Sequence, residues 1–151
     1  AYLGALRDLE QTHGRRLILR VVDTPADAPA TVLNQALRMA GPSAAHLAVD
    51  VTTAGPNALA RFSGGSADIF TLAAPADAEA MAGRLDAYRV AVRDAHRLRA
   101  RVWITHCRSP EAARAALASG AQFLSGGAIA KPGPQPGPVR KVSLAPAQKA
   151  G

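Results

Sequence analysis

His46-Leu47-Ala48-Val49-Asp50-Val51 and Val102-Trp103-Ile104-Thr105-His106 are the stretches that decide the fold class of this chain. Each is a short apolar run rich in β-branched residues, which is typical of a buried strand. Similar runs occupy 17–22, 67–72 and 122–124, and helix-like segments lie between them. Strands that alternate with helices indicate parallel βα units. We therefore predict an α/β fold of about five parallel βα units, a partial or truncated TIM-like (β/α) barrel, since a closed barrel needs about 250 residues.

Several helix starts are visible between these strands. Pro75 is expected as the first residue of the longest helix, and Ser109 as the cap of a later one that has Pro110 at its first position. Asp27 or a neighbour is expected to cap a helix that ends near Met39. Leucines at helical spacing near the start predict one more helix, over 2–14. The longest helix has one apolar stripe, made of Ala78, Met81, Leu85, Tyr88, Val92 and Ala95.

The chain divides into a predicted half-barrel over 1–130 and a basic tail over 131–151. Residues 131–138 contain four prolines and two glycines, which cannot sustain a helix or a central strand. We expect the tail either to cover the edge of the barrel or to be disordered. An open half-barrel also needs a cover for its exposed edges. Further βα units upstream, a protein partner or a second copy would each supply one.

The composition restricts the compartment and the kinds of partner that we expect for this protein. The single Cys107 excludes an internal disulfide and fits a reducing compartment. No apolar run reaches the length of a membrane span, and no nucleic-acid-binding motif is present. The net charge of +7 fits either well-hydrated arginines or an anionic partner. We expect a cytoplasmic domain with no nucleic-acid partner, tethered only if segments upstream of this chain provide an anchor.

A series of strand ends carries a resemblance to a known family. In chain order these segments are Leu19-Arg20-Val21-Val22-Asp23-Thr24, Val49-Asp50-Val51-Thr52-Thr53-Ala54-Gly55, Asp68-Ile69-Phe70-Thr71-Leu72, Ile104-Thr105-His106-Cys107-Arg108-Ser109, and Ser125-Gly126-Gly127 with Pro132. Their order and spacing over 17–132 resemble the C-terminal part of an EAL domain, the bacterial cyclic-di-GMP phosphodiesterase fold. That family ends the corresponding strands in Glu-x-x-Glu, Asp-Asp-Phe-Gly-Thr-Gly, a catalytic Lys, Ala-Glu-Gly-Val-Glu-Thr and Gln-Gly.

The resemblance implies that the family's metal-binding positions are degenerate here. Arg20 stands where the family has a metal-binding Glu, and Asp23 is a remnant of its companion. Asp50 keeps the first residue of the acidic pair, whereas Val51 replaces the second. Hydrolysis with two metals needs several converging oxygen ligands. We therefore expect no metal and no cofactor, and we expect Arg20 to pair with Asp50 instead.

The remaining family positions are replaced as well. Thr71 stands at the position of the catalytic Lys, Thr105 and Arg108 at those of two Glu residues, and Ser125 at that of the Gln. The resemblance therefore implies a catalytically inactive relative, without catalytic residues of its own. Its expected role is a protein-interaction scaffold or regulatory module in cyclic-di-GMP-linked control of motility, polarity or cell cycle, with a protein partner or self-association.

Two alternatives remain open. One is a receptor that binds cyclic-di-GMP without hydrolysing it. The other belongs to a different class, a phosphate-binding aldolase-type barrel enzyme, which the segment 109–129 resembles. Such enzymes need a strand-end Lys or an acid–base pair. The lysines of this chain are Lys131, Lys141 and Lys149, all in the tail.

Two local motifs complete the candidates. His106 and Cys107 are adjacent, so on a strand they would point to opposite faces and could not form a catalytic pair. Ser125-Gly126-Gly127 could present backbone N–H groups to a phosphate, as TIM barrels do after their last strands. The loop over 63–66 is a second glycine turn that is less well placed for this role.

Overall fold

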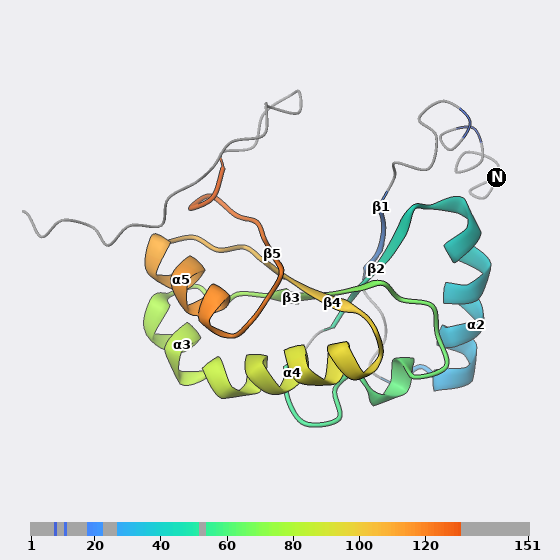
Figure 1. Ribbon diagram of the computed structural model, residues 1–151, viewed down its shortest axis with the longest axis horizontal. Coiled ribbons are helices and arrows are strands. Elements are labelled where there is room, and N and C mark those ends of the chain that lie inside the picture. The colour runs from blue at the N-terminus through green and yellow to red at the C-terminus, as the bar shows by residue number, and fades with distance from the viewer. Residues whose placement is uncertain (1–7, 9–10, 12–17, 23–26, 52–53, 131–151) are drawn as a thin grey trace, which may run out of the picture.

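The structure, a computed structural model, describes residues 8, 11, 18–22, 27–51 and 54–130 (Figure 1). The expected first helix over 2–14 lies outside these residues except for Asp8 and Gln11, which are helical. The tail over 131–151 and Asp23 also lie outside them. The boundary between domain and tail therefore remains a prediction.

Five described strands form one sheet. They are β1 (Ile18–Val21), β2 (His46–Asp50), β3 (Ile69–Ala73), β4 (Arg101–Thr105) and β5 (Phe123–Leu124). The strands lie side by side in chain order, and every neighbouring pair is parallel. A doubly wound sheet reverses its strand order at a switch point, whereas a (β/α) barrel keeps the order of the chain. The predicted α/β class with five parallel strands is confirmed.

The described helices cover one face of this sheet. They are α2 (Ala30–Ala40), α3 (Ala78–Gly83), α4 (Leu85–Arg97) and α5 (Pro110–Ala118), with short 3-10 turns η1 (Gly41–Ser43) and η2 (Ala60–Phe62). Figure 1 shows α4 along the underside of the sheet, with α3 and α5 towards one end and α2 at the other. No described helix lies over the upper side. We call that side the open face.

Alternation along the strands separates the two faces. The helix-side face buries an apolar set that packs against the helices: Leu47, Val49, Phe70, Leu72, Val102 and Ile104. The helices contribute small side chains to the same core, namely Ala91, Ala95, Ala113 and Ala116. Alanine lets backbones approach closely while burying little area per residue. The core therefore depends on close helix–sheet contact more than on bulky anchors.

The helix expected to begin at Pro75 is in fact two helices, so that prediction is wrong. α3 begins at Ala78 because Asp77 caps it, accepting the backbone N–H of Ala80 at 2.7 Å. A carboxylate satisfies an orphan N–H of the first turn, which Pro75 cannot do. The break falls at Gly83 and Arg84, where glycine has a low helix propensity. The apolar stripe still faces the core on both sides of the break, through Met81, Tyr88, Val92 and Ala95.

Of the two other expected helix caps, Ser109 is confirmed and Asp27 is not. Ser109 caps α5, since its hydroxyl accepts the backbone N–H of Ala112 at 3.1 Å. Asp27 does not cap α2, whose cap residue is Pro29 and has no side-chain cap bond. There the Pro29 carbonyl accepts the N–H of Leu33 at 3.1 Å instead. The chain turns into α2 through proline, which pre-sets the backbone at a helix start.

The glycine loop over 63–66 packs against α2. The Arg38 guanidinium donates to the carbonyl of Gly64 at 2.8 Å. A Cβ at Gly65 would lie only 2.6 Å from Oδ1 of the buried Asn34. These glycines therefore allow the loop to pack closely against the helix.

Among the described residues, no helix is long and apolar enough to cross a membrane.

Candidate functional site at the carboxyl ends of the strands

The parallel strands bring Asp50, Thr71 and Trp103 together on the open face. Register pairs Asp50 with Thr71 and Thr71 with Trp103, so the three side chains form one row across β2, β3 and β4. Arg20 on β1 is paired with Ala48, two residues before Asp50 on the same face. Polar side chains from four neighbouring strands thus meet at the carboxyl edge of the sheet.

Arg20 and Asp50 form a bidentate ion pair. The Arg20 Nε donates to one Asp50 carboxylate oxygen at 2.7 Å, and its terminal NH2 group donates to the other at 2.9 Å. The Thr71 hydroxyl donates to the first of these oxygens as well. The two charged side chains are only 34% and 27% exposed, which limits screening by water. The expected pairing of Arg20 with Asp50 is confirmed.

Trp103 extends this network towards β5. The Arg20 guanidinium carbon lies 5.9 Å from the centre of the Trp103 ring, within cation–π range. The indole N–H donates to the Ser125 hydroxyl oxygen at 3.0 Å. Trp103 has no predicted role from the sequence, although it lies two residues before Thr105 on the same face of β4. Its position across from Arg20 depends on sheet register, which the sequence alone does not fix.

The other family positions lie in three different environments. Val51 is buried in the helix-side core rather than at the mouth of the sheet. Thr105 is buried, and its hydroxyl donates to the Leu72 carbonyl at 3.4 Å. Arg108 is exposed and has no hydrogen bond or ion pair with any described residue. The structure therefore gathers Arg20, Asp50 and Thr71, and it leaves Val51, Thr105 and Arg108 outside this group.

These residues do not fit a pair of divalent cations. Such a pair needs several carboxylate oxygens that converge on one point. Here both oxygens of Asp50 are held by the Arg20 guanidinium, which also places a fixed positive charge beside them. In the part of the chain that the structure describes, no three His, Cys, Asp or Glu side chains are grouped to hold a metal ion.

His106 and Cys107 were expected on a strand, whereas in the structure both follow the end of β4 and they differ in burial. Cys107 is fully buried, and this burial raises the pKa of its thiol. His106 is exposed at the start of the loop and adopts a positive φ of 62°. Its Nδ1 lies 2.9 Å from the Thr105 hydroxyl. The buried thiol and the exposed imidazole therefore do not form a nucleophile–base pair.

A cavity of about 540 Å³ opens beside this edge, where β4 and β5 end. His106, Arg108, Ser125, Gly126 and Gly127 line it. The structure thus brings the predicted Ser125-Gly126-Gly127 loop together with the Arg108 guanidinium and the His106 imidazole, which follow β4.

No protein-family model matches the chain, and no curated protein matches it. A match among solved structures is the crystal structure of the Bacillus subtilis YkuI protein, with an EAL domain, in complex with substrate c-di-GMP and calcium. The two chains share 14% sequence identity with a TM-score of 0.53. The match covers 83% of this chain and 31% of that chain, so this chain spans about a third of the length of that protein. The fold is therefore EAL-like, with the parallel strand order of a TIM-like barrel.

Proposed function

We propose that this chain is a catalytically inactive domain of EAL-like fold. In this proposal it acts as a protein-interaction or regulatory module in bacterial c-di-GMP-linked signalling. The observation that carries the proposal is the bidentate contact of Arg20 with Asp50. It places a guanidinium at the edge of the sheet where a metal-dependent phosphodiesterase would need cations.

The chemistry of hydrolysis supports this interpretation. A phosphodiester is cleaved when metal ions activate a water molecule and stabilise the charge of the transition state. Asp50 is already neutralised by Arg20, and Thr71 cannot take part in acid–base chemistry near neutral pH as a lysine could. Among the residues that the structure describes, this edge of the sheet therefore offers hydrogen bonds that join Arg20, Asp50 and Thr71, and no activated nucleophile.

The open face supports the interaction role. Ile18 and Phe123 are 51% and 39% exposed there. They line an apolar groove of about 310 Å³ together with Ile69 and Trp103. Exposed apolar side chains gathered on one face are typical of protein–protein interaction sites. A second copy of the chain or another protein would bury them.

The test is a titration of the dialysed full-length protein with Mn²⁺ and c-di-GMP, followed by calorimetry and by chromatography of the nucleotide. The proposal expects no stoichiometric Mn²⁺ binding and no hydrolysis. Turnover that disappears in an Asp50→Asn variant would overturn it. Heat of c-di-GMP binding without turnover would instead favour the alternative of a non-hydrolytic receptor.

A further inference from the structure

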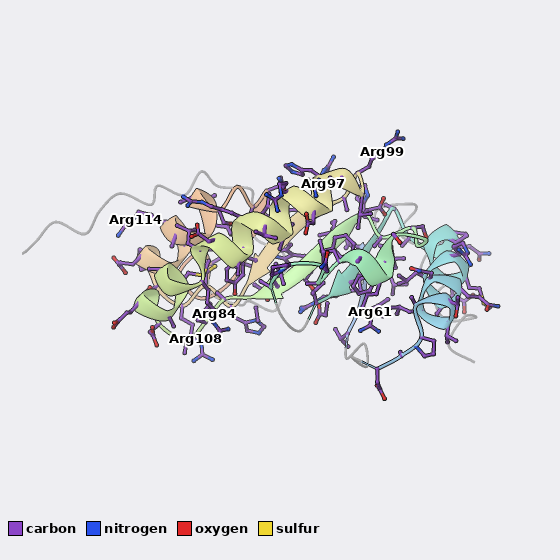
Figure 2. The ribbon with its side chains drawn as sticks, turned by 90° about the horizontal axis from the view of Figure 1, so that it is seen from below. Arg61, Arg84, Arg97, Arg99, Arg108 and Arg114 are labelled. Carbon is purple, nitrogen blue, oxygen red and sulfur yellow. The ribbon has the colours of Figure 1, made fainter. Side chains whose placement is uncertain are left out.

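The cavity at the ends of β4 and β5 combines a positive charge with hydrogen-bond donors. Arg108 lines it and has no partner among the described residues, and no acidic residue is part of the described lining. Figure 2 shows Arg108 and Arg84 towards one end of the molecule, away from Arg97 and Arg99. An unpaired guanidinium at the mouth of a cavity favours an anionic ligand.

Ser125 contributes a donor whose orientation is fixed by its neighbour. Its hydroxyl oxygen accepts the indole N–H of Trp103 at 3.0 Å. The hydroxyl hydrogen has no acceptor among the described residues, so it can donate to a ligand in the cavity. Trp103 is itself held against Arg20, which makes the position of this hydroxyl part of the rigid network on the open face.

The backbone after β5 is held in place by crossing contacts. Cys107 N–H donates to the Ser125 carbonyl at 2.9 Å, and Ala128 N–H donates back to the Cys107 carbonyl at 3.0 Å. Gly126 has a φ of 141°, and a Cβ there would lie 2.3 Å from the Cys107 nitrogen. The Gly127 N–H has no acceptor among the described residues, and a Cβ at Gly127 would meet nothing within 4 Å. The loop is therefore fixed, and Gly127 leaves room beside it.

His106 also lines the cavity. The Thr105 hydroxyl lies 2.9 Å from its Nδ1, so the contact fixes the ring and leaves Nε2 without a described partner. A positive φ in a residue other than glycine carries a conformational cost and is concentrated at functional sites. The donors at the cavity are the Arg108 guanidinium, the Ser125 hydroxyl and the Gly127 N–H, and phosphate oxygens are acceptors.

We propose that this cavity binds the phosphoryl group of a small molecule. Arg108 supplies the charge, while Ser125 and the Gly127 N–H orient the phosphate oxygens. Ile129 and Leu124 form an apolar wall that suits the remainder of the ligand. A volume of about 540 Å³ holds a molecule of nucleotide size. This proposal does not rest on the proposed function, because the cavity can bind a phosphoryl group whether or not the domain docks onto a protein.

The experiment measures binding of pyrophosphate, a purine 5′-mononucleotide and c-di-GMP to the full-length protein by calorimetry at constant ionic strength. Arg108→Gln removes the charge, and Gly127→Val fills the cavity where the fold has open space. Arg89→Gln makes the same charge change on α4, where Arg89 contacts Asp86 instead. We expect both cavity variants to weaken binding at least tenfold and Arg89→Gln to leave it unchanged.

Preference for the mononucleotide would identify a terminal phosphate as the recognised group, and preference for c-di-GMP a phosphodiester. Two results would overturn the proposal. One is absence of measurable binding by all three compounds. The other is equal weakening by Arg108→Gln and Arg89→Gln, which would mean that only the general positive charge of the chain attracts them. Circular dichroism of each variant verifies that the fold is retained.

Discussion

At the scale of single residues, Arg20 has the largest effect on the chemistry of the site. Its guanidinium holds both oxygens of Asp50 and lies over the Trp103 ring. A carboxylate at the same position would instead add a metal ligand beside Asp50. One side chain therefore decides whether the carboxyl edge of the sheet attracts a cation or repels it.

A double-mutant cycle tests this contact. Arg20→Gln is expected to destabilise the protein by about 1 to 2 kcal/mol, because it leaves a half-buried carboxylate without its charged partner. Adding Asp50→Asn should recover part of this loss and give a coupling energy of about 1 kcal/mol in urea unfolding. Arg89→Gln is the control, since its pair with Asp86 is solvent-exposed and should cost less than about 0.5 kcal/mol. A coupling energy near zero would show that the contact between Arg20 and Asp50 does not stabilise the protein.

Tyr88 links α4 to the end of β3. Its hydroxyl donates to the Ala73 carbonyl at 2.6 Å, and burial raises the pKa of the phenol above its ordinary value. Arg84 opposes this shift in part. The folded state therefore holds the Tyr88 proton more tightly than the unfolded chain does. The stability from this group is complete below the ordinary pKa of about 10 and is lost as pH rises through the raised value.

A Tyr88→Phe variant makes this dependence measurable. Near neutral pH it should unfold about 1 kcal/mol more easily, because the Ala73 carbonyl loses its donor. Above pH 10 the difference in unfolding free energy between the two proteins should decrease, because only the wild type has this phenol and loses stability when it deprotonates. Burial also raises the pKa of the Cys107 thiol, and this burial is common to both proteins, whereas the effect of Cys107 on the pKa of Tyr88 is part of the measured difference. A gap that stays constant or widens with pH would count against this account.

At the scale of elements, the loop after β5 contains one glycine that cannot accommodate a side chain and one that can. Gly126 has positive φ and touches the backbone of Cys107, whereas Gly127 has open space around it. Gly126→Ala is therefore expected to cost about 2 to 4 kcal/mol, and Gly127→Ala to stay within about 0.5 kcal/mol of the wild type. Thermal melting of the two variants side by side checks this. Equal melting midpoints of the two variants would show that Gly126 does not contact the backbone of Cys107 as described.

The cap of α5 offers a second test at this scale. Ser109→Ala removes the hydroxyl that accepts the Ala112 N–H and should cost about 1 kcal/mol. Ser109→Gly should cost only a few tenths of a kcal/mol, because glycine leaves that N–H open to water. Urea unfolding of both variants gives the comparison. A larger loss for glycine than for alanine would indicate that backbone freedom matters more here than the cap.

Local signals explain which elements the sequence could predict. The Ser109 cap and the apolar stripe with Tyr88 and Val92 depend on neighbouring residues, and both predictions were confirmed. The break at Arg84 and the start of α3 at Asp77 were missed, since Pro75 offered a competing start a few residues earlier. Helix ends are decided by caps that compete within one turn, and propensity alone does not rank them.

At the scale of the whole molecule, topology carried more information than any motif. Alternating strands and helices predicted the parallel sheet, whose strands bring their carboxyl ends to one edge. The pairing of Arg20 with Asp50 was expected from the positions that the family resemblance assigns to these two residues at that edge. The role of Trp103 depends on the register of the strands. The cavity beside Arg108 depends on contacts between the loops that follow β4 and β5. Those contacts join segments far apart in the chain and leave no periodic pattern in the sequence.

The asymmetry of the sheet leads to the last prediction. Helices cover one face, while the open face exposes Ile18 and Phe123 beside an apolar groove. If that face mediates self-association, Ile18→Lys and Phe123→Lys should lower the weight-average mass in sedimentation equilibrium and leave the thermal midpoint nearly unchanged. Lysine at an interface must be desolvated on association, which disfavours the complex.

Val32→Lys and Met39→Lys are the controls, because both residues are exposed apolar side chains that lie on α2. These controls should associate like the wild type. If they reduce the mass as much as the open-face variants do, added positive charge rather than the sheet surface governs association. A wild type that remains monomeric over a wide range of concentrations would rule out a second copy, and a different protein would then have to cover the open face.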